Sequence, residues 1–166
     1  EVTKIFGFDD FSRGFLPEEN FPDSPWMEKV HLVKQRFQDT TVKELNTLNV
    51  DVVVHLAAYT SGKESIQTPE EYFLNNEYGT FKFMQTILRT QNRPFVIYAS
   101  TIEVYGDSIY TPVDEKHKTL SQNVYAASKL AAEQHIMAAG RLANHPAVSI
   151  RFTNLYGENH NIFGYP

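Results

Sequence analysis

The stretches VDVVVHL, residues 50–56, and FVIYAS, residues 95–100, decide the fold class of this chain. Both are nearly continuous in apolar residues, as are parallel strands that helices cover on both faces. Further short apolar runs flank them, and longer amphipathic stretches lie between. The predicted strands are Lys4–Phe8, Val30–Val33, Val50–Leu56, Phe95–Ser100 and Val148–Phe152.

The stretches between these runs have the spacing of amphipathic helices. One covers about residues 41–48, a second begins at Pro69 and continues to about Thr90, and a third covers about residues 121–142. Pro69 suits the first turn of a helix because its missing N–H would have no partner there. The alternation of strands and helices predicts an α/β fold with a doubly wound, Rossmann-like parallel sheet.

The composition is that of one globular domain. The chain has 166 residues, a net charge of -5 and no cysteine, and no run approaches the roughly 20 apolar residues of a membrane span. Its basic residues are scattered, which argues against nucleic acid as a partner, and no motif indicates a metal site. There is no N-terminal signal pattern, so we expect a cytoplasmic protein without a membrane partner.

Tyr125 and Lys129 form the most informative spacing, because residues four apart share one face of a helix. A tyrosine acts as an acid or base near neutral pH when a nearby cation favours the phenolate, and Lys129 can supply that charge. By itself, however, this spacing is more often that of an ordinary solvated helix face.

Thr101 directly follows the apolar run that ends at Ser100. Ligands of open parallel sheets bind outside the carboxyl ends of the strands, so the Thr101 hydroxyl is placed where a substrate oxygen would meet it. Thr101 and Tyr125 would then flank one reacting alcohol. The alternative is that Thr101 only ends its strand by bonding local backbone.

Several further segments, taken with Thr101 and the Tyr-x-x-x-Lys spacing, resemble one enzyme family. In chain order they are HLAA at 55–58, ESIQTP at 64–69, NNEYGT at 75–80, VYGD at 104–107 and RFTNLYG at 151–157. From about Asp9 to Gly157 the chain resembles the extended short-chain dehydrogenases/reductases, in particular the NAD-dependent nucleotide-sugar epimerases and dehydratases. The resemblance implies NAD as cofactor, a nucleotide sugar as substrate and a homodimer for the intact protein.

Carried over position by position, the resemblance implies that Tyr125 is the catalytic acid/base. Lys129 would support its phenolate and hold the nicotinamide ribose, and Thr101 would hydrogen-bond the sugar hydroxyl. Asn76 resembles a helix asparagine near the active site, and Asn154 one that meets the substrate diphosphate; for both, a structural amide that bonds loop backbone is an equal alternative. The implied cofactor-binding residues are Asp9, Asp10, Phe37, Leu56, Ala57, Ala58, Asn76, Ser100, Tyr125, Lys129 and Phe152.

Asp9 resembles the acidic end of the family's second strand, where a carboxylate bonds the adenosine ribose and repels a 2′-phosphate. This favours NAD over NADP. Arg13 is the opposing feature, because an arginine nearby can pair with that phosphate. Arg36 and Phe37 stand where the family has an acidic residue followed by an aliphatic one, so adenine recognition departs from the family pattern.

None of the eight glycines forms the Gly-x-x-Gly-x-x-Gly turn that holds a pyrophosphate. Because Asp9 would end the second strand, we expect residues 1–166 to be a partial NAD-binding domain, incomplete at its first βα unit. The sheet would then have unpaired edges beside buried neighbours. A substrate-binding region is expected to start near residues 158–166.

Ile102 and Glu103 bear on the reaction class. In the 4,6-dehydratases that this stretch also resembles, these positions hold an aspartate and a glutamate, an acid for the leaving hydroxyl and a base for the neighbouring carbon-bound proton. Ile102 cannot donate a proton, whereas Glu103 is either a candidate base or a solvent-facing residue that caps the following loop. The leading hypothesis is an enzyme that, in intact form, epimerises a nucleotide sugar through a transient 4-keto intermediate. The alternatives are a nucleotide-sugar 4,6-dehydratase and a non-catalytic assembly or binding protein that retains the fold.

Overall fold

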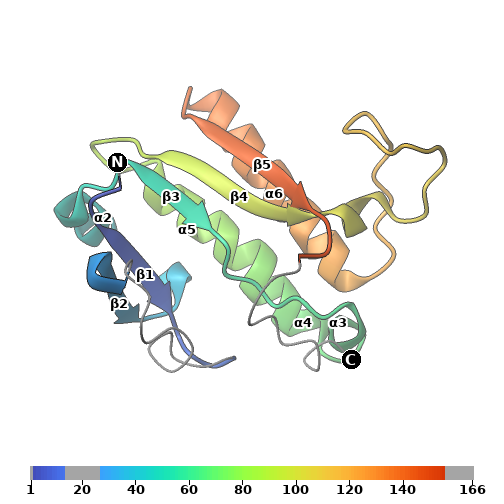
Figure 1. The fold of residues 1–166 in the computed structure, drawn as a ribbon, viewed down its shortest axis with the longest axis horizontal. Helices are drawn as coiled ribbons and strands as arrows, with labels where there is room; N and C mark the ends of the chain where they lie inside the picture. The colour runs from blue at the N-terminus through green and yellow to red at the C-terminus, as the bar shows by residue number, and fades with distance from the viewer. Residues whose placement is uncertain (1, 14–26, 156–166) are drawn as a thin grey trace.

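The computed structural model describes residues 2–13 and 27–155, in which all strand pairings are parallel. The strands run in one direction and helices lie behind them (Figure 1). The five predicted strands are confirmed within two residues at either end. They form a two-stranded sheet of β1 (Ile5–Asp9) and β2 (Val30–Lys34), and a three-stranded sheet in the order β3 (Val52–His55), β4 (Phe95–Thr101), β5 (Ala147–Phe152).

The predicted helices are confirmed, with differences in detail. The stretch from Pro69 is helical but contains a π-helical segment in its middle, and it is preceded by a separate helix that was not among the predicted ones. The helices are α2 (Val42–Leu48), α3 (Gly62–Gln67), α4 (Pro69–Tyr72), the π-helix η3 (Phe73–Gly79), α5 (Thr80–Ile87) and α6 (Val124–Leu142), with short 3-10 turns η1 (Met27–Lys29), η2 (Phe37–Asp39) and η4 (Ile102–Tyr105). No helix in this described part is long and apolar enough to cross a membrane.

Side-chain caps set where the helices begin. Helix α6 starts at Val124, three residues after the predicted start, because the side chain of Asn123 accepts a hydrogen bond from the N–H of Ala126 at 2.7 Å. Helix α3 starts after Ser61, whose side chain accepts from the N–H of Glu64. Both caps satisfy donors that the first turn of a helix leaves without a partner.

Within residues 2–13 and 27–155, no strand of one sheet pairs with a strand of the other. Strand β1 pairs only with β2, and β3 pairs only with β4, so each has one unpaired edge among the described strands. This agrees with the unpaired edges expected from the sequence. The predicted start of a substrate-binding region near residues 158–166 lies outside the described residues.

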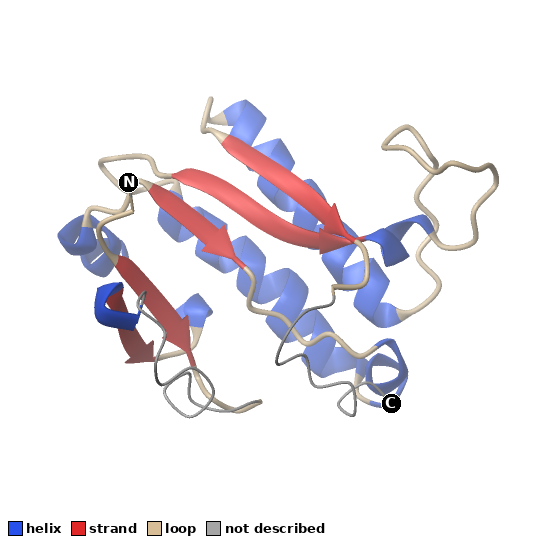
Figure 2. Ribbon diagram, viewed as in Figure 1, coloured by secondary structure: helices blue, strands red, loops and turns tan. Residues whose placement is uncertain are grey.

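Helices α5 and α6 cover one face of the three-stranded sheet (Figure 2). The core lies between this face and the two helices, and its buried members include Phe83, Met84, Ile87, Val96, Tyr98 and Ile136. The apolar side chains of Val52, Val54 and Ile150 remain 48%, 53% and 40% exposed. The apolar runs predicted strands that helices cover on both faces, but the described residues do not cover both faces of this sheet.

The sheet-facing side of α6 buries a lysine among its apolar residues. Lys129 is only 3% exposed, and its Nζ lies 4.5 Å from the centre of the Tyr98 ring on β4. Burial lowers the pKa of Lys129 to about 8, because the charged amine loses its hydration. Helix α6 thus carries a residue that opposes folding while it is charged.

Replacing Lys129 by methionine is expected to stabilise the fold at pH 7. The folded-state pKa of about 8 lies below the ordinary value of 10.5, so the charged amine opposes folding fully below pH about 8 and progressively less as the pH rises toward 10.5. The difference corresponds to on the order of 3 kcal/mol at pH 7. Urea unfolding should show Lys129→Met above the wild type at pH 7, with most of this gain absent at pH 10.

The matched control is Lys63→Met, because Lys63 is exposed on α3. This variant should change the free energy of unfolding little, and equally at both pH values. A Lys129→Met protein that is less stable than the wild type at pH 7 would contradict the expected cost of the buried amine.

Candidate active site at the carboxyl ends of the strands

The main candidate catalytic residues come from two elements that pack against each other. Thr101 is the last residue of β4, and Tyr125 and Lys129 lie in the first two turns of α6. All three are at least nine-tenths buried, with 7%, 7% and 3% of their surfaces exposed. The structure therefore places the predicted tyrosine, lysine and threonine at the carboxyl ends of the strands, on rigid elements rather than on loops.

The surroundings of Tyr125 and Lys129 are aromatic. The Tyr125 ring meets the ring of Tyr72 edge-on, with 6.4 Å between the ring centres, and Lys129 lies over the face of Tyr98. His55, the last residue of β3, is buried as well. Its pKa falls to about 3, mainly because burial disfavours the charged imidazole and secondly because of the positive charge of Lys129. His55 is thus a neutral residue of the core, and Lys129 is the cation of this region.

The Thr101 side chain is engaged with local backbone, as the alternative interpretation predicted. Its Oγ1 accepts a hydrogen bond from the N–H of Glu103 at 3.2 Å and so begins the 3-10 turn η4. This bond uses an acceptor site of the hydroxyl, whose own proton is still available to donate. Capping the turn and binding a substrate oxygen are therefore compatible.

Glu103 connects the end of β4 to the start of α6. Its Oε2 accepts a hydrogen bond from Nδ2 of Asn123 at 3.0 Å, and Asn123 is the N-cap residue of α6. Glu103 is exposed and one of its carboxylate oxygens remains outside this bond, so both interpretations of Glu103, a candidate base and a solvent-facing residue that caps the following loop, stay predictions.

Asn76 has a structural role. Its Oδ1 accepts from the N–H of Tyr59 at 2.8 Å and from the side chain of Asn75. Its Nδ2 donates to the carbonyl of Tyr59 and to Oγ of Ser128. These four bonds use the whole capacity of an amide, so Asn76 ties the loop after β3 to the residue before Lys129. The equal alternative, a structural amide, is the one that the structure supports.

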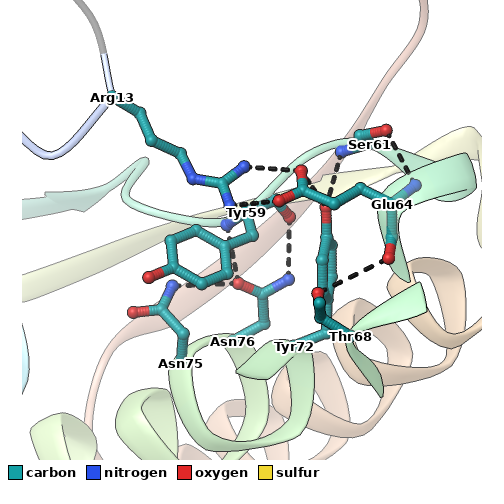
Figure 3. A network of polar contacts seen from close by, with 8 residues as sticks. All are labelled: Arg13, Tyr59, Ser61, Glu64, Thr68, Tyr72, Asn75 and Asn76. Atoms are coloured by element: carbon teal, nitrogen blue, oxygen red, sulfur yellow. Dashed lines mark hydrogen bonds and ion pairs between the residues drawn. The ribbon is translucent and has the colours of Figure 1, made fainter. Parts of the chain in front are cut away.

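A polar network crosses from the end of β1 to α3 (Figure 3). The guanidinium of Arg13 lies 4.0 Å from the centre of the Tyr59 ring and donates to both carboxylate oxygens of Glu64. The hydroxyl of Tyr72 donates to the same carboxylate at 3.2 Å and accepts from the N–H of Ser61. Arg13 holds the pKa of Glu64 below its usual value, so both charges are already paired.

The acidic end of β1 is also organised locally. Asp9 Oδ1 accepts from the N–H of Phe11 at 2.7 Å, and Asp10 Oδ1 accepts from the N–H of Ser12 at 2.9 Å. The guanidinium of Arg36 lies 3.9 Å from Asp10, and hydrogen bonds from Ser12, together with this cation, lower the pKa of Asp10. Both carboxyl groups therefore accept hydrogen bonds from backbone N–H groups at the strand end.

The Phe37 side chain, which the resemblance assigns to the cofactor, packs in the core. It is 8% exposed, and its ring lies 4.6 Å from the ring of His55 and 5.8 Å from that of Phe83. The aromatic side chain belongs to the core under β3, because an apolar ring of this size gains most when it leaves water. Its role in cofactor binding stays a prediction.

The remaining predicted residues lie along the same edge with different accessibility. Ser100 is buried at 4%, whereas Leu56, after β3, is 63% exposed. The others are half-buried or exposed: Ala57, Ala58 and Phe152 are half-buried, and Asn154 is exposed. No group of three metal-ligating side chains lies together in residues 2–13 and 27–155.

The residues that are present fit an NAD molecule along this edge. A dinucleotide needs acceptors for its adenosine ribose, and the carboxylates of Asp9 and Asp10 lie at the end of β1, while α6 carries the buried amine of Lys129. Sequence reasoning missed the partners Glu64 and Tyr72, because Arg13 and Glu64 are 51 residues apart and no spacing rule joins them.

Comparison with known proteins gives concordant findings. The model of the NAD dependent epimerase/dehydratase family matches residues 4–164. The chain is 30% identical over 143 residues to UDP-glucose 4-epimerase of Mycoplasma pneumoniae, covering 84% of this chain and 42% of that protein. It is 35% identical over 118 residues to a trifunctional UDP-glucose 4,6-dehydratase/UDP-4-keto-6-deoxy-D-glucose 3,5-epimerase/UDP-4-keto-L-rhamnose-reductase of Arabidopsis thaliana, covering 69% of this chain and 18% of that protein.

A solved structure shows the same fold. UDP-N-acetylglucosamine 4-epimerase from Methanobrevibacter ruminantium M1, in complex with UDP-N-acetylmuramic acid, has a TM-score of 0.80 at 27% identity, covering 96% of this chain and 51% of that one. The chain thus spans about half of this structure and 42% of the Mycoplasma relative. The family model covers nearly the whole chain, and the fold is that of a Rossmann-like relative. This chain therefore belongs to the NAD dependent epimerase/dehydratase family.

Proposed function

We propose that the intact protein oxidises and re-reduces one hydroxyl of a nucleotide sugar with NAD, in the manner of a 4-epimerase. The observation that carries this proposal is the buried pair Tyr125 and Lys129 on α6, a helix that packs against β4, the strand that buried Thr101 ends. Residues 1–166 supply part of the NAD-binding domain, with the substrate-binding region beginning near residue 158.

Three side chains would perform the proton chemistry. Thr101 donates a hydrogen bond to the sugar hydroxyl oxygen and orients it, while the Tyr125 phenolate takes the proton of that hydroxyl. Lys129, which is buried and cationic below pH about 8, favours the phenolate that this step requires. NAD, when bound, takes up the hydride and returns it to the 4-keto sugar. Re-reduction on the opposite face of the sugar inverts the carbon.

The region around Glu103 favours epimerisation over dehydration. A dehydratase needs both an acid and a base after the threonine, and here Ile102 has no proton to donate. Glu103 is bound to Asn123 at the start of α6. The second candidate, a 4,6-dehydratase, is favoured by the free carboxylate oxygen of Glu103 and by the Arabidopsis relative, whose name includes that activity.

An exposed aromatic surface supports the proposal of a homodimer. Phe73, Tyr78 and Phe81 are 47%, 51% and 42% exposed on η3 and α5. Together with Glu77 and His135 of α6, whose Oε1 and Nε2 atoms lie 3.8 Å apart, they line one pocket. A second copy placed on a two-fold axis would cover this surface on both chains at once, as isologous contacts do.

Replacing Tyr125 by phenylalanine in the intact protein should lower kcat by about 10²–10⁴-fold, because the group that transfers the proton is lost. The dissociation constant for NAD should change less than about twofold, since the ring remains in place. Steady-state kinetics with UDP-glucose and UDP-N-acetylglucosamine, together with calorimetric NAD titration, measure both. Tyr110→Phe, at an exposed tyrosine of the loop between η4 and α6, is the control and should retain turnover. An active Tyr125→Phe enzyme would refute the assignment.

The wild type should prefer NAD to NADP, and Glu64→Gln should narrow that preference. In the wild type Arg13 is paired with Glu64, whereas glutamine keeps the shape and a carbonyl acceptor but releases the guanidinium for a 2′-phosphate. A charge-assisted pair of this kind predicts about a tenfold gain in NADP affinity. Titration of both cofactors measures it. The double variant Arg13→Gln with Glu64→Gln should lose the gain; a gain that persists would show that another cation binds the phosphate.

Products of the intact enzyme should have the mass of their substrates. Without an acid at position 102, loss of water would forgo a contribution of about 10²–10⁴-fold in rate. Mass spectrometry after incubation with NAD and a panel of UDP- and dTDP-sugars tests this. A product of the wild type that is lighter by one water would establish the dehydratase alternative instead. Ile102→Asp is the matched variant. If the epimerase assignment holds, Ile102→Asp should form more of the dehydrated product than the wild type does.

A further inference from the structure

Arg151, in β5, makes a two-pronged ion pair with Glu133 of α6. Its Nε donates to Glu133 Oε2 at 3.2 Å and its Nη2 donates to Oε1. Ser149, two residues earlier on β5, donates a further hydrogen bond to the same carboxylate at 3.1 Å. The side chains of Arg151 and Glu133 are only 17% and 7% exposed, so the pair is held in a nearly dry contact between helix and sheet.

The same guanidinium contacts a third element. It lies 4.7 Å from the centre of the Tyr105 ring, and Tyr105 ends the turn η4 that Thr101 begins. Tyr105 is itself 7% exposed and packs edge-on against His117. Arg151 therefore joins β5, α6 and η4 at one point.

This junction lies close to the candidate catalytic residues along both α6 and the sheet. Glu133 lies one helical turn after Lys129 and two turns after Tyr125, on the buried face that all three share. In the sheet Arg151 is opposite Ser100, and the next pair is Thr101 with Phe152. The ion pair thus fastens α6 to the sheet one residue away from the register of Thr101.

The other contacts of α6 with the sheet restrain rotation weakly. Ala126, Ala132 and Ile136 are apolar and without direction, and the Tyr98 hydroxyl donates only a long hydrogen bond of 3.5 Å to the Lys129 carbonyl. A two-pronged arginine pair, by contrast, fixes both distance and angle. Side chains end about 5–6 Å from a helix axis, so a rotation of about 10° moves them by about 1 Å. A displacement of that size at a reacting group lowers rates by as much as about 10²-fold.

We propose that the Glu133–Arg151 pair is a positioning device that sets the rotation of α6, and hence the placement of Tyr125 and Lys129 against Thr101. The inference rests on the proposed function and adds two positioning residues to it. Neither side chain touches the reacting atoms. Their effect is on kcat, while NAD affinity and the overall fold are largely retained.

The test uses Glu133→Gln and Arg151→Lys in the intact protein, with UDP-glucose and UDP-N-acetylglucosamine as substrates. Glutamine keeps the size of Glu133 but loses its charge, and lysine keeps the charge of Arg151 but loses the fork and the stacking on Tyr105. Each variant should lower kcat about 10–100-fold, with KM and the NAD dissociation constant within about threefold of the wild type. If Glu133→Gln does not fold, Arg151→Lys alone decides the question by the same readouts.

The control matched for stability is Ile136→Val, one turn farther along the same buried face. It should cost stability through a lost methylene yet leave kcat within about twofold. If the Glu133 and Arg151 variants keep wild-type kcat, or lose no more than Ile136→Val does at equal loss of stability, the pair is merely structural and the proposal is overturned. Failure of the proposed function itself is distinguishable, because it would appear as turnover that survives Tyr125→Phe.

Discussion

The packing of helix α6 against β4 and β5 is the contact on which the rest of the structure depends. Helix α6 carries Tyr125 and Lys129, and it packs against β4, the strand that ends at Thr101. Small residues such as Ala126 and Ala132, both fully buried, let the helix approach the strands closely. Because the helix and the strands are both regular elements, a group on either one is held more rigidly than a loop residue would be.

This contact also buries polar groups, which lowers the stability of the fold. The side of α6 that faces the sheet buries an amine and a carboxylate, and these are compensated in different ways. Glu133 has Arg151 and Ser149, and hydrogen bonds from Arg151 hold its pKa below the usual value although burial opposes its charge. Lys129 has the face of Tyr98, and its pKa falls. A buried ammonium without a carboxylate partner among the described residues is typical of a functional group rather than of a structural one.

The two sheets are linked by side chains where backbone pairing is absent. Arg13, after β1, reaches over Tyr59 to Glu64 of α3, so that the carboxyl ends of both sheets are connected through one ion pair and one ring contact (Figure 3). A partly exposed ion pair of this kind is worth little in stability. The pair instead affects which charges a ligand would meet at this edge. Among the described residues, Asp9 and Asp10 are carboxylates with no ion pair or only a weak one, whereas the Arg13 cation is already bound to Glu64.

The sequence by itself determined the strands, the long helices and the location of the catalytic candidates. Apolar runs such as FVIYAS report burial directly, and the spacing of Tyr125 and Lys129 reports a shared helix face, since both depend on residues close in the chain. Tertiary structure alone decided what each side chain does. It placed Phe37 in the core, used all four bonds of Asn76 for support, and joined Arg13 to Glu64 and Arg151 to Glu133. These outcomes depend on partners from distant parts of the chain, and no local pattern records a pairing that only the folded arrangement brings within reach.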